Sequence, residues 1–470
     1  MTDASKVHPL QGFRGEEFVR ADGTPRDPTQ AELNDARFAP GTASEHPYAV
    51  LYQGEFETPW DGTAAAVRLH ARALALMGIP VRLTSFSHCV TNEHGYADPV
   101  HEVGLPAAVE NEVGSLYLTR ATTQVPVIRH AVVRSAEHAV SLLVPRGAVA
   151  PTEEVADIIA MRRLVASSTI LYSVWERDHV DDSMARELNR AGQLWVPCMQ
   201  NAAMLAKSGV LPERLSVVPH PYDPEDDICK VAALKRAHRD QHDHGWRLFY
   251  SIGRWEPRKG YAELIHAFLQ AFTPEDRVML TIKHTGNAWK GYPTPEEAMR
   301  AAAYRAGHWT AEQIAQRVVL LSGRGPRTGI LELHYRNNIY VSSSHGEAWC
   351  LPAFEARLAG NALVAVPYGG VVDFMGPDGS EHLSVVEPSG MELVPDSYQW
   401  PVGTKWCRFD VSGLAAALQR ARCPKEFVLP EDMKRFELRR VGEQMLDLIM
   451  PLAQKVKPEA ARYYKERMNG

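Results

Sequence analysis

Short apolar runs alternate with longer amphipathic stretches along most of the chain. The first example is an apolar run at residues 48–52, a helical pattern at 62–77 and a second apolar run at 81–86. These runs lack the strict polar alternation of a half-exposed strand, which is typical of parallel strands that are buried on both faces. The pattern therefore predicts β-α-β units and an α/β fold.

The same alternation starts again in the second half. Further apolar runs lie at 168–174, 194–197, 215–219, 248–252, 278–283, 318–322 and 339–343. A single hydrophobic core stops growing near roughly 250–300 residues, whereas this chain has 470. We therefore predict two Rossmann-like, doubly wound parallel-sheet domains that face a central cleft.

Changes in polarity set the predicted boundaries. Residues 1–45 are polar and rich in turn formers, which predicts an N-terminal extension. The first domain is expected at 46–221 and the second at 222–430, with the charged stretch at the start of the second serving as a connection. Residues 431–470 read as amphipathic helices, broken at Pro451, that pack back on the first domain.

Composition narrows the classes of partner and compartment. The net charge of −6 produces no field that favours a polyanion. The chain has neither a signal-peptide pattern nor an apolar run of about 18 residues, so we expect no integral membrane segment and a cytoplasmic location. The six cysteines are scattered without a CxxC pair, which predicts neither a disulfide framework nor a zinc site.

The first stretch with chemical content is SIGRWEPRKGYAELIHAF. Gly253 ends an apolar run, and Arg254 and Lys259 flank the loop that leads into a helix. Ligands of such sheets bind at the carboxyl ends of the strands. Two cations beside a helix N-terminus form an anion site, which a diphosphate would suit.

The second stretch is YVSSSHGEAWCLPAFEARLAGNALVAVPYGG, in which Glu347 lies in a loop and Glu355 in the helix that follows. Eight helical steps span roughly 12 Å, which exceeds the separation of a glycosidase acid and nucleophile. The two glutamates are therefore expected to hold different parts of one extended ligand. Carboxylates accept paired hydrogen bonds from vicinal hydroxyls, so a sugar nucleotide would satisfy both glutamates and both cations.

These residues resemble the large retaining glycosyltransferase family 4. The resemblance rests on GxR followed by KG, here Gly253, Arg254, Lys259 and Gly260, and on the two glutamates within SxxxGExxxLPxxEAxxxG, over at least residues 248–370. It implies the GT-B fold and the transfer of a sugar from a nucleotide-diphosphate donor to a hydroxyl acceptor with retained configuration.

The resemblance also implies individual roles. Arg254 and Lys259 would bind the donor diphosphate, Glu355 the ribose and Glu347 the transferred sugar, so Glu347, Arg254 and Lys259 form the expected catalytic set. Gly323 lies in a loop that matches the family's base-binding loop less closely, and Trp349 is the best-placed tryptophan to stack on a sugar.

The first half resembles the family less specifically. Its Trp-Glu, ending at Glu176, is similar to a segment near the acceptor, and Cys198 replaces the serine of the family's "wvpS" strand. The residues expected on the acceptor or donor-sugar side are Gly62, Thr63, His130 and Glu176. For the histidine that touches the donor sugar, His88 and His130 both remain candidates.

Two further departures concern the second half, where Asp373 replaces the glutamate of GGxxE and Asn338 replaces an acid. The pair Asp181 and Asp182 is not expected to bind metal, because Arg254 and Lys259 already neutralise a diphosphate.

Several alternatives stay open at this point. A phosphorylase or nucleotide-sugar epimerase would use the same fold, and a non-catalytic protein would bind the sugar nucleotide without turnover. The nucleotide sugar is expected as a co-substrate, with no further cofactor and no metal. The acceptor is expected to be a saccharide, a lipid or a small metabolite, with nucleic acid also left open. Assembly of the protein into a homo-oligomer is likewise left open.

Overall fold

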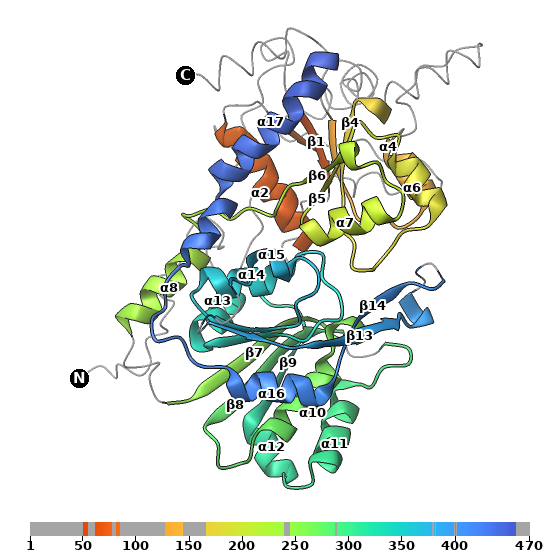
Figure 1. Ribbon diagram of the computed structural model, residues 1–470. Coiled ribbons are helices and arrows are strands. Elements are labelled where there is room, and N and C mark those ends of the chain that lie inside the picture. The colour runs from red at the N-terminus through yellow and green to blue at the C-terminus, as the bar shows by residue number, and fades with distance from the viewer. Residues whose placement is uncertain are drawn as a thin grey trace, which may run out of the picture. The chain divides into compact units, whose positions relative to one another are not determined.

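Two parallel sheets, each six strands wide among the residues described, organise the chain. The computed structural model describes residues 50–54, 62–77, 81–84, 127–143, 166–238, 245–286, 289–377, 380, 382–398, 400 and 402–456 (Figure 1). Of these, residues 224–434 together with Glu176–Asp178 form what we call the second unit, and the others form the first unit. The predicted α/β class with two parallel sheets is confirmed.

The sheet of the first unit has the strand order β2-β1-β3-β4-β5-β6, and all its pairings are parallel. Its strands are β1 (Val50–Gly54), β2 (Val81–Thr84), β3 (Val127–His130), β4 (Thr169–Tyr172), β5 (Gln193–Val196) and β6 (Leu215–Val217). Every residue of β3 and β4 is buried, because helices cover both faces of the sheet.

Two apolar clusters lie on the two faces of this sheet. One includes side chains of α2 (Gly62–Leu76) and α17 (Leu438–Val456). The other includes side chains of α4 (Ala136–Leu143), α6 (Asp182–Leu188) and α7 (Met199–Lys207). Asp181, half of the rejected metal pair, caps α6 by accepting from the Met184 backbone N–H at 2.8 Å.

The sheet of the second unit has the strand order β12-β11-β10-β7-β8-β9, again with parallel pairings. Its strands are β7 (Arg247–Arg254), β8 (Val278–Thr285), β9 (Val318–Ser322), β10 (Ile339–Ser342), β11 (Ala362–Ala365) and β12 (Leu383–Val385). The strand order reverses between β7 and β10. This is the topological switch point at which such sheets bind ligands.

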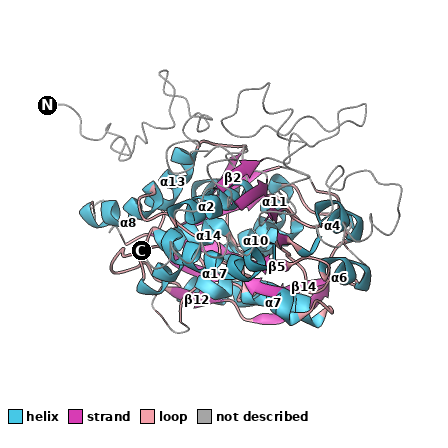
Figure 2. Ribbon diagram, turned by 90° about the horizontal axis from the view of Figure 1, so that it is seen from above, coloured by secondary structure: helices cyan, strands magenta, loops and turns pink. Residues whose placement is uncertain are grey.

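Helices lie on both sides of the second sheet (Figure 1), and Figure 2 distinguishes the helices from the strands by colour. On one side are α10 (Tyr261–Ala271), α11 (Pro295–Ala306), α12 (Ala311–Arg317) and α16 (Val411–Arg420), and on the other are α8 (Asp227–Ala237), α13 (Arg327–Arg336), α14 (Leu351–Leu358) and α15 (Val371–Phe374). The remaining elements are the hairpin of β13 (Pro388–Leu393) and β14 (Lys405–Phe409) and the 3₁₀ turns η4 (Pro212–Arg214), η5 (Pro257–Lys259), η6 (Asp396–Tyr398) and η7 (Glu431–Phe436).

The charged stretch expected to be a connection contains a helix, α8, because its buried Ile228 and Val231 give it an apolar side within the second unit. The expected break at Pro451 is wrong. α17 continues through Pro451, since Ile449 and Leu452 on either side of the proline are buried in the core of the first unit. Burial of these side chains outweighs the backbone hydrogen bond that the proline lacks.

The contact of α17 with α2 depends on a glycine. The Leu438 backbone N–H donates to the Tyr222 carbonyl oxygen at 2.9 Å, which fixes the start of α17. Further along, a Cβ atom at Gly442 would lie 2.4 Å from the Ala73 carbonyl oxygen of α2. The two helix backbones can therefore approach this closely only where α17 has no side chain.

Replacement of Gly442 by alanine is expected to destabilise the first unit by about 1–3 kcal/mol, because the inserted methyl group forces the helices apart. The matched control is Gly413→Ala in α16, where an added Cβ meets nothing within 4 Å. There the higher helix propensity of alanine should stabilise by about 0.5–1 kcal/mol. Thermal unfolding of both variants measures the difference, and equal shifts in Tm would contradict the close approach.

Candidate functional site

The candidate site lies where β7 and β10 end, on either side of the switch point. After β7, the turn η5 and the left-handed Gly260 (φ 62°) lead into α10. A Cβ at Gly260 would lie 2.3 Å from the Ser343 carbonyl oxygen in the loop that follows β10. The glycine thus serves both the turn and the contact, and the two loops pack directly on each other.

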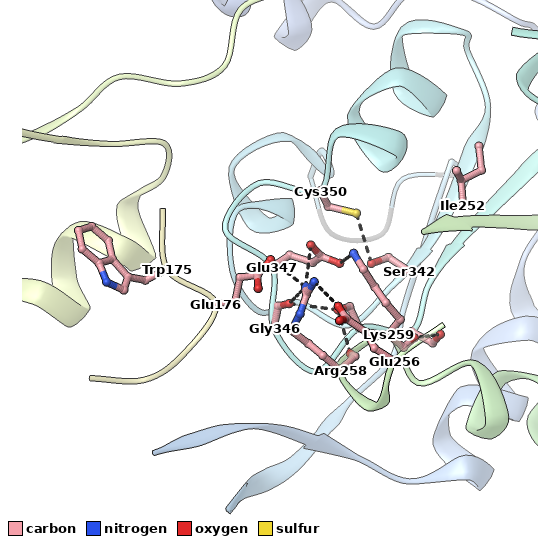
Figure 3. A network of polar contacts seen from close by, with 12 residues as sticks. Trp175, Glu176, Ile252, Glu256, Arg258, Lys259, Ser342, Gly346, Glu347 and Cys350 are labelled. Atoms are coloured by element: carbon pink, nitrogen blue, oxygen red, sulfur yellow. Dashed lines mark hydrogen bonds and ion pairs between the residues drawn. The ribbon is translucent and has the colours of Figure 1, made fainter. Parts of the chain in front are cut away.

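A cluster of five charged side chains occupies this position (Figure 3). The Arg258 guanidinium contacts Glu176 at 3.0 Å, Glu256 at 2.6 Å and Glu347 at 3.2 Å, and Lys259 Nζ pairs with the other carboxylate oxygen of Glu347. We call Glu176, Glu256, Arg258, Lys259 and Glu347 the Arg258 cluster. Its two cations are shared among three carboxylates, so every carboxylate has a charged partner.

Electrostatics in the cluster favour the charged forms of Glu347 and Arg258 but not that of Glu176. Burial alone would raise the pKa of Glu347, but Lys259 and Arg258 outweigh it, and the pKa of Glu347 lies below its ordinary value. Burial opposes the charge of Arg258, but its three carboxylate partners raise its pKa well above the usual value. At Glu176 burial has the larger effect and raises the pKa of this carboxyl, against the attraction of Arg258.

Arg258 was not identified from the sequence, although it is the central cation of the cluster. The sequence offers two neighbouring cations in PRKG, and only the turn η5 determines that both point to Glu347. The carbonyl oxygen of Gly346 also accepts a hydrogen bond from Arg258 at 2.7 Å. The basic pair before the glycine was therefore the available signal, but it does not say which cation is buried.

Glu176 reaches the cluster because Gly346 leaves room for it. A Cβ at Gly346 would lie 2.4 Å from the Glu176 carbonyl oxygen. Two residues further on, the Asp178 carboxylate accepts from the Lys405 backbone N–H at 2.8 Å, and the Asp178 N–H donates to the Lys405 carbonyl oxygen. These contacts fix the segment Glu176–Asp178 within the second unit.

Glu355 belongs to a separate polar group. One of its carboxylate oxygens contacts Arg327, and the other accepts from His334 Nε2 at 3.3 Å. Burial opposes its charge, but Arg327 and His334 outweigh burial and lower the pKa of Glu355 to about 2. The two glutamates of the sequence motif therefore have different partners.

Arg254 lies at the exposed end of β7, outside the Arg258 cluster. Its guanidinium lies 6.0 Å from the centroid of the Trp289 ring, in a cation–π contact. At the neighbouring Gly253, a Cβ would lie 2.6 Å from the Tyr261 hydroxyl oxygen. Of the two cations expected at the diphosphate, Lys259 thus contacts Glu347, whereas Arg254 faces solvent.

The other expected donor-side residues lie in different surroundings. Trp349 is buried and packs against Phe354 and Phe374, with ring centroids 5.3 and 5.1 Å away. Gly323 is exposed after β9 with a φ of 92°, and its carbonyl oxygen accepts from Lys283 Nζ at 2.6 Å. The buried indole of Trp349 therefore supports the loop that carries Glu347 and does not offer a face to solvent.

In the first unit, Gly62 and Thr63 form the first two residues of α2. His130, at the end of β3, is buried, and its Nδ1 lies 3.0 Å from the Tyr52 hydroxyl oxygen. Burial, together with the nearby His70 and His220, lowers the pKa of His130 well below its ordinary value. The alternative candidate, His88, lies outside the described residues.

Two departures from the family pattern have local roles. The Cys198 sulfur caps α7 by accepting from the Asn201 backbone N–H at 3.4 Å, which is a serine's function at this position. The Asn338 side chain accepts from the Leu248 N–H at 2.9 Å and donates to the Trp246 carbonyl oxygen at 3.2 Å, so it ties β10 to β7.

The described part of the chain contains no group of three or more histidine, cysteine, aspartate or glutamate side chains that could hold a metal ion. Nor does any helix in it combine the length and the apolar character needed to cross a membrane.

Comparison with known proteins supports the fold. No family model matches the chain. A lipopolysaccharide 1,2-N-acetylglucosaminetransferase of Salmonella typhimurium is 27% identical over 143 residues, which are 30% of this chain and 35% of that protein. The chain thus aligns with about a third of the length of this curated relative.

Solved structures match over most of the chain. HepE of Anabaena in complex with UDP has a TM-score of 0.51 at 14% identity and covers 85% of this chain and 99% of its own. The trehalose 6-phosphate synthase of Burkholderia multivorans has a TM-score of 0.54 at 12% identity, with 88% and 99% covered. The lipopolysaccharide outer core galactosyltransferase WaaB has a TM-score of 0.51 at 13% identity, with 86% and 99% covered. The chain therefore shares the GT-B fold of these glycosyltransferases.

Proposed function

We propose that the protein is a glycosyltransferase that moves a sugar from a nucleotide-diphosphate donor to a hydroxyl acceptor. The observation that carries the proposal is the Lys259–Glu347 pair at the switch point of the second sheet. Arg254 is exposed nearby, at the end of β7. A cation for phosphate and a carboxylate for sugar hydroxyls meet there. The similarity to HepE, which was solved with UDP and with UDP and glucose, supports this class of donor.

The proposed donor would extend from Glu355 to Glu347. Glu355 would accept hydrogen bonds from the ribose hydroxyls, since its low pKa keeps it ionised. The diphosphate would bind Lys259 and Arg254 beside the N-terminal end of α14, whose backbone N–H groups favour anions. The transferred sugar would then lie against Glu347, and Gly323 near the base.

We further propose retention of configuration without a metal ion. As the bond between sugar and phosphate breaks, Glu347 would stabilise positive charge on the sugar, and the cations would stabilise the departing diphosphate. The acceptor hydroxyl would attack from the face that the phosphate leaves, and its proton would pass to the departing phosphate oxygen as the new bond to the sugar forms. Glu176, which Arg258 links to Glu347, is the proposed residue on the acceptor side.

The direct test is incubation of the protein with a panel of nucleotide sugars and hydroxyl acceptors in excess chelator. We expect acceptor-dependent release of the nucleoside diphosphate, because side chains supply the positive charge. Nuclear magnetic resonance of the product reports the anomeric configuration. Loss of transfer that added metal restores would contradict the metal-independent scheme, and an inverted product would contradict retention.

Arg254→Ala should weaken binding of the free nucleoside diphosphate by roughly ten- to a hundredfold, because one charge-assisted contact is lost. Its exposed position predicts an unchanged fold. Arg336→Ala, which removes an exposed cation paired with Glu332 on α13, is the control and should leave affinity unchanged. Isothermal titration calorimetry measures the affinity of the wild type and both variants for the nucleoside diphosphate. Equal affinities of the three proteins would contradict a role of Arg254 in the site.

The two glutamates should differ in their effects. Glu355→Gln is expected to weaken binding of both the free nucleotide and the full donor, since the ribose is common to both. Glu347→Gln should leave nucleotide affinity nearly unchanged and lower kcat more than it raises KM for the donor. Titration with nucleotide, paired with steady-state kinetics, measures both effects, and the opposite pattern would reverse the two roles.

A further inference from the structure

A chain of buried hydrogen bonds ends on Glu355. It starts at Lys235 of α8, whose Nζ donates to the side-chain oxygen of Asn361 and to the Asn337 carbonyl oxygen. The Asn361 amide nitrogen lies 2.7 Å from the Tyr250 hydroxyl oxygen, and that oxygen lies 2.7 Å from His334 Nδ1. His334 Nε2 then contacts Glu355.

The direction of every bond in this chain is determined by chemistry. A carbonyl oxygen only accepts, so the Asn361 NH₂ group faces the His334 carbonyl and Tyr250, and the Asn361 side-chain oxygen faces Lys235. The ionised Glu355 carboxylate only accepts, so the single proton of the neutral imidazole is on Nε2, and Nδ1 accepts from the Tyr250 hydroxyl.

Burial makes this arrangement rigid. Lys235 and His334 are fully buried, and the His334 ring also contacts the Tyr250 ring edge-on, at 5.5 Å between centroids. Burial, which outweighs the attraction of Glu355, lowers the pKa of His334, so the ring stays neutral. A neutral ring with both nitrogens bonded has one tautomer and one orientation.

At Glu355 the chain meets a group that is open on its other side. The Glu355 side chain retains 20% exposure, and the oxygen that His334 does not bind contacts Arg327, whose side chain is 46% exposed. One oxygen is thus anchored by the buried His334, while the other contacts the partly exposed Arg327. A side chain held in this way presents its free lone pairs in one direction.

We propose that His334 is a positioning residue, which the chain from Lys235 through Asn361 and Tyr250 locks as the Nε2–H tautomer so that Glu355 presents one oxygen to the vicinal hydroxyls of a nucleotide ribose. This inference rests on the proposed function, in which Glu355 binds the ribose. It makes His334 the residue that enables the site to distinguish a ribose from a ribose that lacks its 2′ and 3′ hydroxyls.

The experiment compares two ligands that differ only in these hydroxyls. The nucleoside diphosphate, chosen among UDP, ADP and GDP by the largest thermal shift, is titrated alongside its 2′,3′-dideoxy form. The matched variants are His334→Asn, whose short amide still accepts from Tyr250 but does not reach Glu355, and His334→Gln, whose longer amide does. Both variants lose the ring and its edge-on contact with Tyr250.

The wild-type protein is expected to bind the ribose form roughly ten- to a hundredfold more tightly than the dideoxy form, as charge-assisted hydrogen bonds would require. In His334→Asn this ratio should fall to within about threefold of one, through loss of affinity for the ribose form alone, and in His334→Gln it should stay close to wild type. A general structural defect would instead weaken both ligands together.

The outcomes separate the two proposals. A wild-type ratio near one, or no binding of any nucleotide, overturns the ribose role of Glu355 and with it this inference. A wild-type ratio that persists in folded His334→Asn overturns the role of His334 and leaves the proposed function standing. If neither His334 variant folds, Tyr250→Phe removes one hydroxyl, and a reduced ratio in that variant supports the positioning role while an unchanged ratio contradicts it.

Discussion

The buried guanidinium of Arg258 contacts carboxylates from three segments that are far apart in the sequence, those of Glu176, Glu256 and Glu347. Removal of the guanidinium would leave buried carboxylate charge uncompensated, at a cost of about 3–5 kcal/mol. The planar fork can serve several carboxylates at once, which an ammonium group could not do with the same geometry. The loops after β7 and β10, and the segment Glu176–Asp178, therefore keep their places because Arg258 is among them.

This arrangement has a consequence for Lys259. Because Arg258 already neutralises part of the charge of Glu347, Lys259 would give up some of its contact with that carboxylate in the proposed donor complex. A phosphate oxygen would then replace a carboxylate oxygen as its partner, so the cation never lacks a counter-charge. In the proposed complex Arg258 would keep its three carboxylate partners, and only Lys259 would exchange one of its contacts.

The two glutamates show how one chemical group acquires two environments on neighbouring elements. Glu347 lies in a loop among buried charges, whereas Glu355 lies in α14, between the exposed Arg327 and the fully buried His334. Both carboxylates are held ionised, but by different neighbours. Each can therefore respond to its own part of a ligand without changing the charge of the other.

The sequence by itself determined the two parallel sheets and the position of Gly253 to Lys259 and of Glu347 beside the ends of β7 and β10, because apolar periodicity and glycine punctuation are local signals. It did not identify Arg258, the burial of Trp349, the helix α8 or the continuity of α17 through Pro451. Those features depend on partners far along the chain, such as Arg258 and Gly346, which are 88 residues apart. Only the tertiary structure decided them, since the pairing of a charge or the burial of a ring is fixed by what packs against it and not by its neighbours in sequence.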